Sequence, residues 1–302
     1  MNPTVTVVTI VYNLVKANRE AVFRRCVESV HDQTYAQIEH IIIDGASDDG
    51  TLELVGEYVE KGWVKCYSEK DSGIYNAMNN GIKHANGKYI AFLNSDDFWF
   101  GKDCVEKNVA ALEGENADYS YSDTCFLYDG GKRKKYSKAA LRKILYKMPF
   151  CHQTMFTKLE TLRNEGCFNE KYRGAGDYDL MLRLFLKGYK SVCVEGCFTG
   201  FSVAGWSVQN SKVSDNEFVE ALSSHLSDIL TREECEQMFQ TRIVPEKLLD
   251  YEKLLISKKD YNLNKIDNIL YKIKNIRGKI ISIRLNKTPK VFRLFGIDFI
   301  KE

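Results

Sequence analysis

Apolar and polar positions alternate along the first hundred residues with two different periods. Short apolar runs, rich in β-branched residues, have the length of buried strands, and the segments between them place apolar residues three and four apart, as helices do. The predicted strands are 4–11, 38–44, 63–68 and 88–93, and the predicted helices are 17–33, a segment ending at Glu60, and 74–85. This alternation predicts an α/β protein with a mainly parallel sheet that helices cover on both faces.

The pattern is less regular in the second hundred residues. The predicted elements are a short strand at 149–156, an apolar helix at 177–187, and two strands at the edge of the sheet at 189–194 and 198–203. From about Asp215 the sequence has helical character and becomes increasingly charged. We therefore predict a sheet-containing domain over residues 1–214 and a helical C-terminal extension over residues 215–302.

The composition narrows the class of protein. Of the 302 residues, 44% are apolar and 28% are charged, which is the balance of a soluble globular protein and excludes general disorder. No stretch approaches the ~20 uncharged apolar residues of a membrane span, and the N-terminal segment has no features of a secretory signal. The nine cysteines contain no CxxC pair, which argues against a disulfide framework or a zinc ribbon. We therefore predict a cytoplasmic protein.

The charge is unevenly distributed along the chain. Residues 241–302 carry 15 Lys and Arg against 7 Asp and Glu, a net of +8, whereas the remainder carries 28 against 34, a net of −6. Within this tail, Ile and Leu recur three and four positions apart from Ile266 to Ile283, with lysines beside them. Such a stripe predicts a helix that binds an anionic membrane surface; packing of the helix on protein is an equal alternative. The tail lacks interleaved aromatics and known reader motifs, which argues against a nucleic-acid partner.

Polar side chains follow all four predicted strands at the point where each strand ends. Because ligands bind at the carboxyl ends of the strands in an open parallel sheet, we expect these side chains to share one rim. The four ends are Tyr12-Asn13, Asp44, Glu69–Gly73 and Asn94–Asp97. Each carboxylate alone can equally be a helix cap, but the four ends together predict a ligand site.

The candidate ligand carries phosphate, although the usual phosphate loops are missing. The chain has no GxGxxG after the first strand and no Walker lysine, so dinucleotide and P-loop sites are poorly supported. Asp96 and Asp97 instead follow the fourth strand directly. Carboxylates on a short turn suit Mg²⁺ or Mn²⁺, which proteins often hold with one or two carboxylates plus substrate phosphates. We therefore predict a Mn²⁺ or Mg²⁺ site at Asp96 and Asp97 that meets a diphosphate.

Five motifs follow one another in the order and spacing of a known family. They are Val5–Asn13, Ile41–Thr51, Asp71–Gly81, Phe92–Asp97, and Gly176–Leu180 with Arg183. Over residues 4–205 the chain resembles glycosyltransferase family 2, which has the GT-A fold, and especially its bacterial polysaccharide-type members. Each motif alone is unspecific, whereas five in order are highly specific. The resemblance implies a GT-A domain that binds a nucleotide-diphosphate sugar.

The resemblance also assigns roles to individual positions. It implies that Asp44 accepts a base N–H of a uracil-like ring and that Asp177 is the catalytic base. The positions implied to border the nucleotide and its phosphates are Thr9, Tyr12, Asn13, Asp44, Asp71, Asn79, Ser95 and Asp96. Two acidic residues of the family's motifs are replaced here, because the first aspartate of the metal signature is Asn94 and the glutamate before the base is Gly176.

Three further residues each have a structural alternative. Asp177 begins a predicted helix, whose N-terminus favours an ionised carboxylate and thus a proton acceptor at neutral pH; the alternative is a simple helix cap. His152 and Trp206 are candidates for contact with the acceptor or the diphosphate. Core packing is the alternative for both residues.

These observations predict an inverting, metal-dependent glycosyltransferase of hexosyltransferase type that uses a UDP-sugar. The resemblance implies a saccharide or lipid-linked saccharide acceptor in surface polysaccharide synthesis, and the tail favours peripheral association with the inner face of the cell membrane. Two alternatives stay open. A sugar nucleotidyltransferase would need a glycine-rich, basic phosphate loop after the first strand. The retained Asp96 and Asp177 argue against a catalytically inactive nucleotide- or sugar-binding subunit, whereas Asn94 and Gly176 keep that alternative open.

Overall fold

A computed structural model describes residues 2–203, 211–248, 292–294 and 297–299 of the chain. Backbone contacts divide the chain into two units, residues 1–260 and 261–302. The first unit therefore extends past residue 214, where the sequence places the end of the sheet-containing domain. In the described ranges, no helix is both long and apolar enough to cross a membrane.

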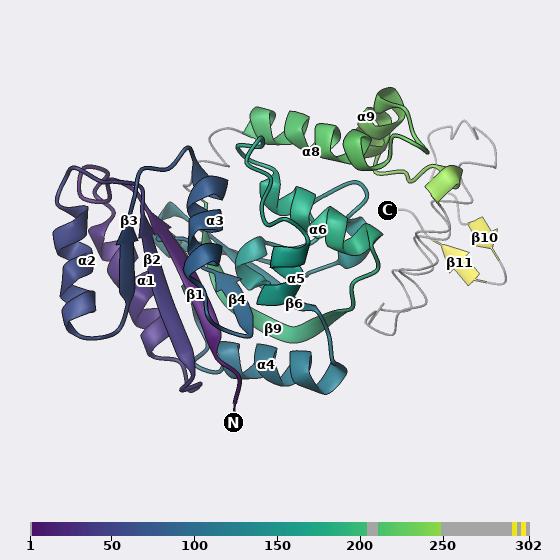
Figure 1. Cartoon of the computed structure of the whole chain (residues 1–302). Helices are drawn as coiled ribbons and strands as arrows, with labels where there is room; N and C mark the ends of the chain where they lie inside the picture. The colour runs from purple at the N-terminus through teal and green to yellow at the C-terminus, as the bar shows by residue number, and fades with distance from the viewer. Residues whose placement is uncertain (1, 204–210, 249–291, 295–296, 300–302) are drawn as a thin grey trace. The chain divides into compact units, whose positions relative to one another are not determined.

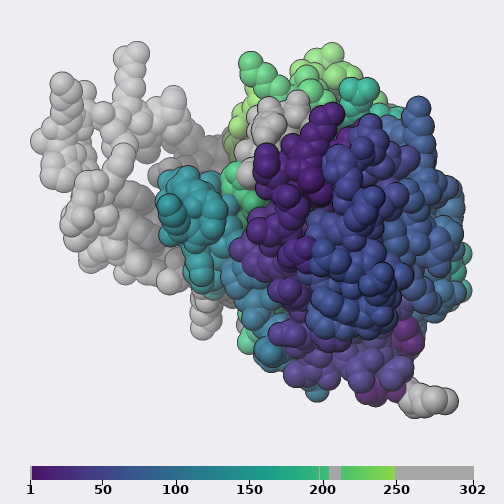
Figure 2. All heavy atoms as spheres, turned by 90° about the vertical axis from the view of Figure 1, so that its left-hand side faces the viewer, coloured from purple at the N-terminus to yellow at the C-terminus, as the bar shows by residue number. Residues whose placement is uncertain are grey.

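The N-terminal half of the first unit is a parallel sheet with helical crossovers (Figure 1). Its elements are β1 (Val5–Val11), α1 (Glu20–His31), β2 (Ile38–Asp44), α2 (Thr51–Glu60), β3 (Lys65–Ser68), α3 (Ile74–His84) and β4 (Tyr89–Phe92). β2 and β4 pair in parallel with β1, and β3 pairs in parallel with β2, which gives the order β3-β2-β1-β4. The predicted α/β alternation is confirmed. Figure 2 shows these elements, purple to blue, forming one face of the unit.

The second half of the sheet is mixed in direction. Its elements are β5 (Phe98–Trp99), α4 (Cys104–Glu115), β6 (Tyr119–Tyr128), η1 (Asp129–Gly131), β7 (Arg133–Ser137), η2 (Leu141–Lys143), η3 (His152–Thr154), β8 (Phe156–Lys158), α5 (Leu159–Asn164), α6 (Gly176–Leu186) and β9 (Ser191–Ser202). β8 runs antiparallel to both β4 and β6, and β9 runs parallel to β6 and antiparallel to β5. β8 thus joins the parallel half of the sheet to β6 and β9.

Helices cover both faces of the sheet, as the sequence predicts. Val7 of β1 belongs to a core cluster with residues of α1 and α4, whereas Val8 faces α3 on the other side. α3 approaches β1 so closely that a β-carbon at Gly81 would lie 2.4 Å from Cγ1 of Val8. A glycine is therefore required where α3 crosses the strand that leads into the site.

Two strand predictions in the second half are wrong. Residues 149–156 contain the 3₁₀ turn η3, because the hydroxyl and amide of Thr154 both donate to the carbonyl of Cys151 and close a turn. Residues 189–194 and 198–203 are parts of the single strand β9, which lies between β6 and β5 rather than at an edge. The apparent break is a bulge in the pairing with β6, where Gly196 has a φ of +120°.

The C-terminal part of the first unit is helical, with α8 (Ser211–His225), α9 (Arg232–Thr241) and the turn η4 (Glu246–Leu248). α8 packs against α6 and α9, and a capping box between Thr231 and Glu234 begins α9. In the second unit, β10 (Phe292–Leu294) and β11 (Ile297–Phe299) form an antiparallel pair, so the helical prediction is wrong for these residues. Apolar and charged residues alternate there with the period of a strand. The stripe Ile266–Ile283 lies outside the described residues.

Candidate functional site

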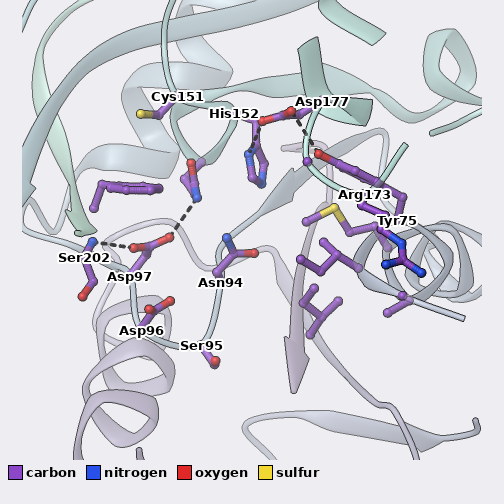
Figure 3. Close-up of a pocket in the computed structure, with 18 of the residues that line it drawn as sticks. Tyr75, Asn94, Ser95, Asp96, Asp97, Cys151, His152, Arg173, Asp177 and Ser202 are labelled. Carbon is purple, nitrogen blue, oxygen red and sulfur yellow. Dashed lines mark hydrogen bonds and ion pairs between the residues drawn. The ribbon is translucent and has the colours of Figure 1, made fainter. Parts of the chain in front are cut away.

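A pocket of about 690 Å³ lies at the carboxyl ends of β1 and β4, bordered by α3, η3 and α6 (Figure 3). Its position is the one that the topology of a parallel sheet predicts for a ligand. The polar and charged residues that line it are Tyr12, Arg19, Asp71, Tyr75, Asn94, Ser95, Asp96, Asp97, His152, Gln153, Arg173, Asp177, Ser202, Ser214 and Asp215. The structure therefore brings together residues from all the polar strand ends except Asp44.

Asp177 lies in the first turn of α6 and is held by several donors. The hydroxyl of Tyr75 donates to its Oδ1 at 3.1 Å, and the amide of Tyr178 donates to the same oxygen at 2.9 Å. Nδ1 of His152 lies 3.1 Å from Oδ2. Only 8% of Asp177 is exposed, so the carboxylate is a fixed, nearly buried group at the wall of the pocket. Burial, together with the charge of Asp177, raises the pKa of Tyr75 well above its usual range, which keeps this phenol a donor.

His152 comes from η3, the turn that sequence reasoning assigned to a strand. Its other ring nitrogen, Nε2, is buried and has no hydrogen-bond partner among the described residues. The neighbouring Gln153 donates from Nε2 to Oδ2 of Asp97 at 2.9 Å. The turn η3 thus contacts both acidic parts of the pocket: His152 contacts Asp177, and Gln153 contacts Asp97.

Asp96 and Asp97 have different surroundings. Asp96 lines the pocket and pairs with Arg19, with 2.8 Å between Oδ2 and Nη2. Asp97 is 1% exposed, and its two oxygens accept from Gln153 and from the amide of Ser202, at 2.9 and 2.8 Å (Figure 3). Burial, and then the charge of Asp96, raise the pKa of Asp97 well above its usual range. Asp97 therefore ties the turn after β4 to η3 and β9, and its role as a metal ligand stays a prediction.

The donor set near Asp96 fits a metal that is bound partly by its substrate. Among the described residues, no three His, Cys, Asp or Glu side chains gather as a metal site. Mg²⁺ and similar ions need only one or two protein carboxylates when phosphate oxygens supply the other ligands. Asp96 can provide one carboxylate oxygen to the pocket, and the polar side chains of Asn94 and Ser95 lie beside it.

The predicted nucleotide-binding residues fall into two groups. Tyr12, Asp71, Ser95 and Asp96 line the pocket, and Tyr12 is 63% exposed. A β-carbon at Gly45 would lie 2.5 Å from Oδ2 of Asp71 and 3.2 Å from Cδ2 of Tyr12. Both side chains therefore pack closely against the backbone of Gly45. Burial raises the pKa of Asp71, with a smaller contribution from the charge of Asp44.

The remaining nucleotide-binding candidates have their side chains bonded within the protein. Asp44 is fully buried and accepts from Ser47 and Ser68. Thr9 is also fully buried, donates to the carbonyl of Leu93 at 2.8 Å and accepts from His40. The last two candidates hold loops: Asn13 accepts from the amide of Asp48, and Asn79 bonds to Phe168 and Glu170. Trp206 lies outside the described residues.

Sequence reasoning missed several residues that shape the site. Arg19 and Arg173 contribute cations to the lining, and no motif marked either of them. Glu217 of α8 accepts from the consecutive amides of Arg173, Gly174 and Ala175, just before α6. This contact joins residues more than forty positions apart, and Glu217 otherwise looks like one charge among many on a helix.

Comparison with protein families and curated proteins gives consistent matches. The family described as Glycosyl transferase family 2 matches residues 6–173, more than half of the chain. A PGL/p-HBAD biosynthesis glycosyltransferase of Mycobacterium bovis is 30% identical over 177 residues, 56% of this chain and 66% of that protein. An uncharacterized glycosyltransferase of Mycobacterium tuberculosis is 42% identical over 114 residues, 37% of this chain and 41% of that protein. The chain thus spans about two thirds, or less, of these relatives.

Two solved structures have the fold of this chain. Staphylococcus aureus TarS 1–349 in complex with UDP-GlcNAc has a TM-score of 0.60 at 17% identity, covering 89% of this chain and 78% of that one. The mannosyltransferase PcManGT of Pyrobaculum calidifontis in complex with GDP-Man and Mn²⁺ has a TM-score of 0.61 at 17% identity, covering 91% and 81%. The predicted GT-A fold is confirmed.

Proposed function

The chain belongs to glycosyl transferase family 2, and from this premise we propose that it transfers a sugar from a nucleoside-diphosphate donor to an acceptor hydroxyl, with inversion. The proposal rests on Asp96 and Asp177, which line one pocket, Asp96 from the turn between β4 and β5 and Asp177 from α6. Two separate carboxylates suit two separate tasks, one at the diphosphate and one on the side of the acceptor hydroxyl. Inversion in a single displacement needs no covalent intermediate, so one base suffices.

The donor in this proposal is a UDP-sugar. Its nucleoside would lie beside Tyr12 and Asp71, and Asp44 is the nearby candidate for a base N–H, since a carboxylate accepts the N–H of uracil. Ser95 would line the same site, and Thr9, Asn13 and Asn79 would support it from behind through their bonds within the protein. The related structures hold UDP-GlcNAc and GDP-Man, which supports a nucleotide-sugar donor and leaves the sugar to be identified by assay.

We further propose that Asp96 binds Mn²⁺ or Mg²⁺ together with the donor phosphates. When bound, such an ion supplies a Lewis acid for the departing diphosphate. The Mn²⁺ complex of the related mannosyltransferase supports a divalent ion. Arg19 and Arg173 line the same pocket and offer cations to the phosphate oxygens.

The acceptor in this proposal is a saccharide or a lipid-linked saccharide. The apolar side chains that line the pocket include Phe126, Met148, Phe201 and Phe218. Aromatic and aliphatic surface suits the C–H face of a sugar or an attached apolar group. A role in surface polysaccharide synthesis, near the inner face of the membrane, would be consistent with the basic tail.

Calorimetric titration of the full chain with UDP, with and without Mn²⁺, tests donor binding. The proposal expects binding that Mn²⁺ strengthens. The second candidate function, an inactive nucleotide- or sugar-binding subunit, is favoured by the replacement at Asn94. It predicts the same UDP binding without turnover of any nucleotide sugar. Absence of UDP binding in both conditions would reject both functions.

A further inference from the structure

His152 carries a polar atom whose role the fold does not explain. The residue lines the pocket and pairs with Asp177 through Nδ1, yet its Nε2 is buried and has no partner among the described residues. An unsatisfied buried polar atom lowers the stability of a fold, so this atom requires an explanation such as a bound or reacting group. In Figure 3 the ring extends from Asp177 toward the side of the pocket that carries Asn94.

The pairing with Asp177 determines which nitrogen carries the ring proton. A carboxylate oxygen only accepts hydrogen bonds, so Nδ1 is the donor and Nε2 keeps its lone pair in the neutral ring. Both oxygens of the carboxylate already accept hydrogen bonds, because Tyr75 and the amide of Tyr178 donate to Oδ1 while His152 donates to Oδ2. Nε2 is thus the one acceptor atom of this pair that receives no hydrogen bond from the described residues.

We propose that Nε2 of His152, rather than an oxygen of Asp177, receives the proton of the acceptor hydroxyl, an inference that rests on the proposed function. The acceptor oxygen bonds to the anomeric carbon, and the bond from that carbon to the diphosphate breaks with its electron pair staying on the diphosphate. The hydroxyl proton moves to Nε2 and later leaves to water. Asp177 orients the ring and stabilises the imidazolium that forms.

A second His–Asp pair in the chain provides a matched comparison. Nε2 of His225 in α8 lies 2.8 Å from Oδ1 of Asp179 in α6, and neither residue lines the pocket. Here the opposite ring nitrogen faces the carboxylate. The geometry therefore implies opposite tautomers, with the proton on Nδ1 in His152 and on Nε2 in His225.

Nitrogen-15 NMR of the full chain, labelled at histidine, tests the tautomers without any substrate. The variants His152→Asn and His225→Asn assign the two rings through the loss of their signals. We expect an Nδ1–H ring for His152 and an Nε2–H ring for His225. A neutral His152 ring with its proton on Nε2 would overturn the proposal, because that atom could not accept a proton.

Hydrolysis of UDP-GlcNAc and GDP-Man, with water as the acceptor, tests the chemistry. We expect His152→Ala to lower kcat by about 10²–10⁴-fold with little change in the donor KM, and added imidazole to restore part of the activity. His225→Asn should keep the wild-type rate and show no response to imidazole. Near-wild-type turnover of His152→Ala, or a loss that imidazole does not restore, would overturn the proposal and leave Asp177 as the direct acceptor.

Different results would contradict the proposed function and the assignment of the proton to His152. A wild-type chain that hydrolyses no nucleotide sugar would contradict the proposed function, whatever the tautomer of His152. An active wild-type chain whose Asp177→Asn variant is inactive, but whose His152→Ala variant is not, would contradict only the assignment of the proton to His152.

Discussion

The backbone of Gly176 lies so close to the ring of Tyr75 that a β-carbon at position 176 would be 2.8 Å from Cδ2 and Cε2 of the ring. The hydroxyl of the same tyrosine donates to Asp177. The glycine that stands where the family motif has a glutamate thus leaves room for a tyrosine that holds the neighbouring carboxylate. The replacement at Gly176, which favoured an inactive protein when only the sequence was considered, has a structural reason.

We predict that Gly176→Ala displaces Tyr75, lowers the free energy of unfolding by about 1–3 kcal/mol and reduces turnover. Gly114→Ala is the matched control, since Gly114 lies in α4 with nothing within 4 Å of an added β-carbon. The control should be neutral or gain about 0.5–1 kcal/mol. Urea denaturation of both variants measures the difference. Equal effects of the two substitutions would show that the Tyr75 contact does not restrict position 176.

The two adjacent aspartates should respond differently to substitution. Asp96→Ala should abolish the strengthening of UDP binding by Mn²⁺ without unfolding the chain. Asp97→Ala should retain that strengthening and lower the melting temperature, because the bonds to Gln153 and Ser202 are both lost. Calorimetry and thermal unfolding of each variant separate the two effects. Loss of the Mn²⁺ effect in Asp97→Ala alone would reassign the metal to Asp97.

His40 should make the fold sensitive to acid. Burial lowers the pKa of His40 to about 3, whereas an unfolded chain titrates near ~6.5. Between these values the unfolded chain binds more protons, so stability falls as the pH falls, by about 2 kcal/mol from pH 7 to pH 5 for this group. His40→Gln should remove this part of the pH dependence in urea titrations at both pH values. An unchanged difference between pH 7 and pH 5 in the variant would assign the acid sensitivity to other groups.

The basic tail should bind anionic vesicles if the Ile266–Ile283 stripe is an interfacial helix. The full chain should then sediment with phosphatidylserine vesicles, and binding should weaken as salt screens the charges. A chain ending at Leu248 should remain in the supernatant and still bind UDP, because every proposed site residue precedes that position. Aggregation or early melting of the shortened chain would instead favour packing of the tail on protein.

The sequence predicts the parallel half of the sheet well because each strand and helix there has its own local period. It also predicts the rim of the pocket, since the carboxyl ends of parallel strands meet at one edge. It does not predict which polar residues point into the pocket: Asp44 lies at a predicted strand end and Thr9 lies near one, but their bonds to His40, Ser47 and Ser68 turn them inward.

Other features depend on contacts that no local pattern encodes. The His152–Asp177 pair joins η3 to α6, and the bulge at Gly196 resembles a break between two strands when only the sequence is considered. Glu217 reaches three amides from a helix that the sequence assigned to a separate extension. Each of these contacts forms only when the tertiary structure is complete.

Nucleotide release from a panel of UDP- and GDP-sugars, compared between the wild-type chain and Asp177→Asn, tests whether the chain turns over a nucleotide sugar and needs the Asp177 carboxylate to do so. We predict that the wild type turns over at least one donor with Mn²⁺ present. Asp177→Asn should bind UDP as tightly but turn the donor over about 10²–10⁴-fold more slowly, because His152 then lacks its carboxylate partner. Turnover of Asp177→Asn at the wild-type rate, or a wild type that turns over no donor, would contradict the account.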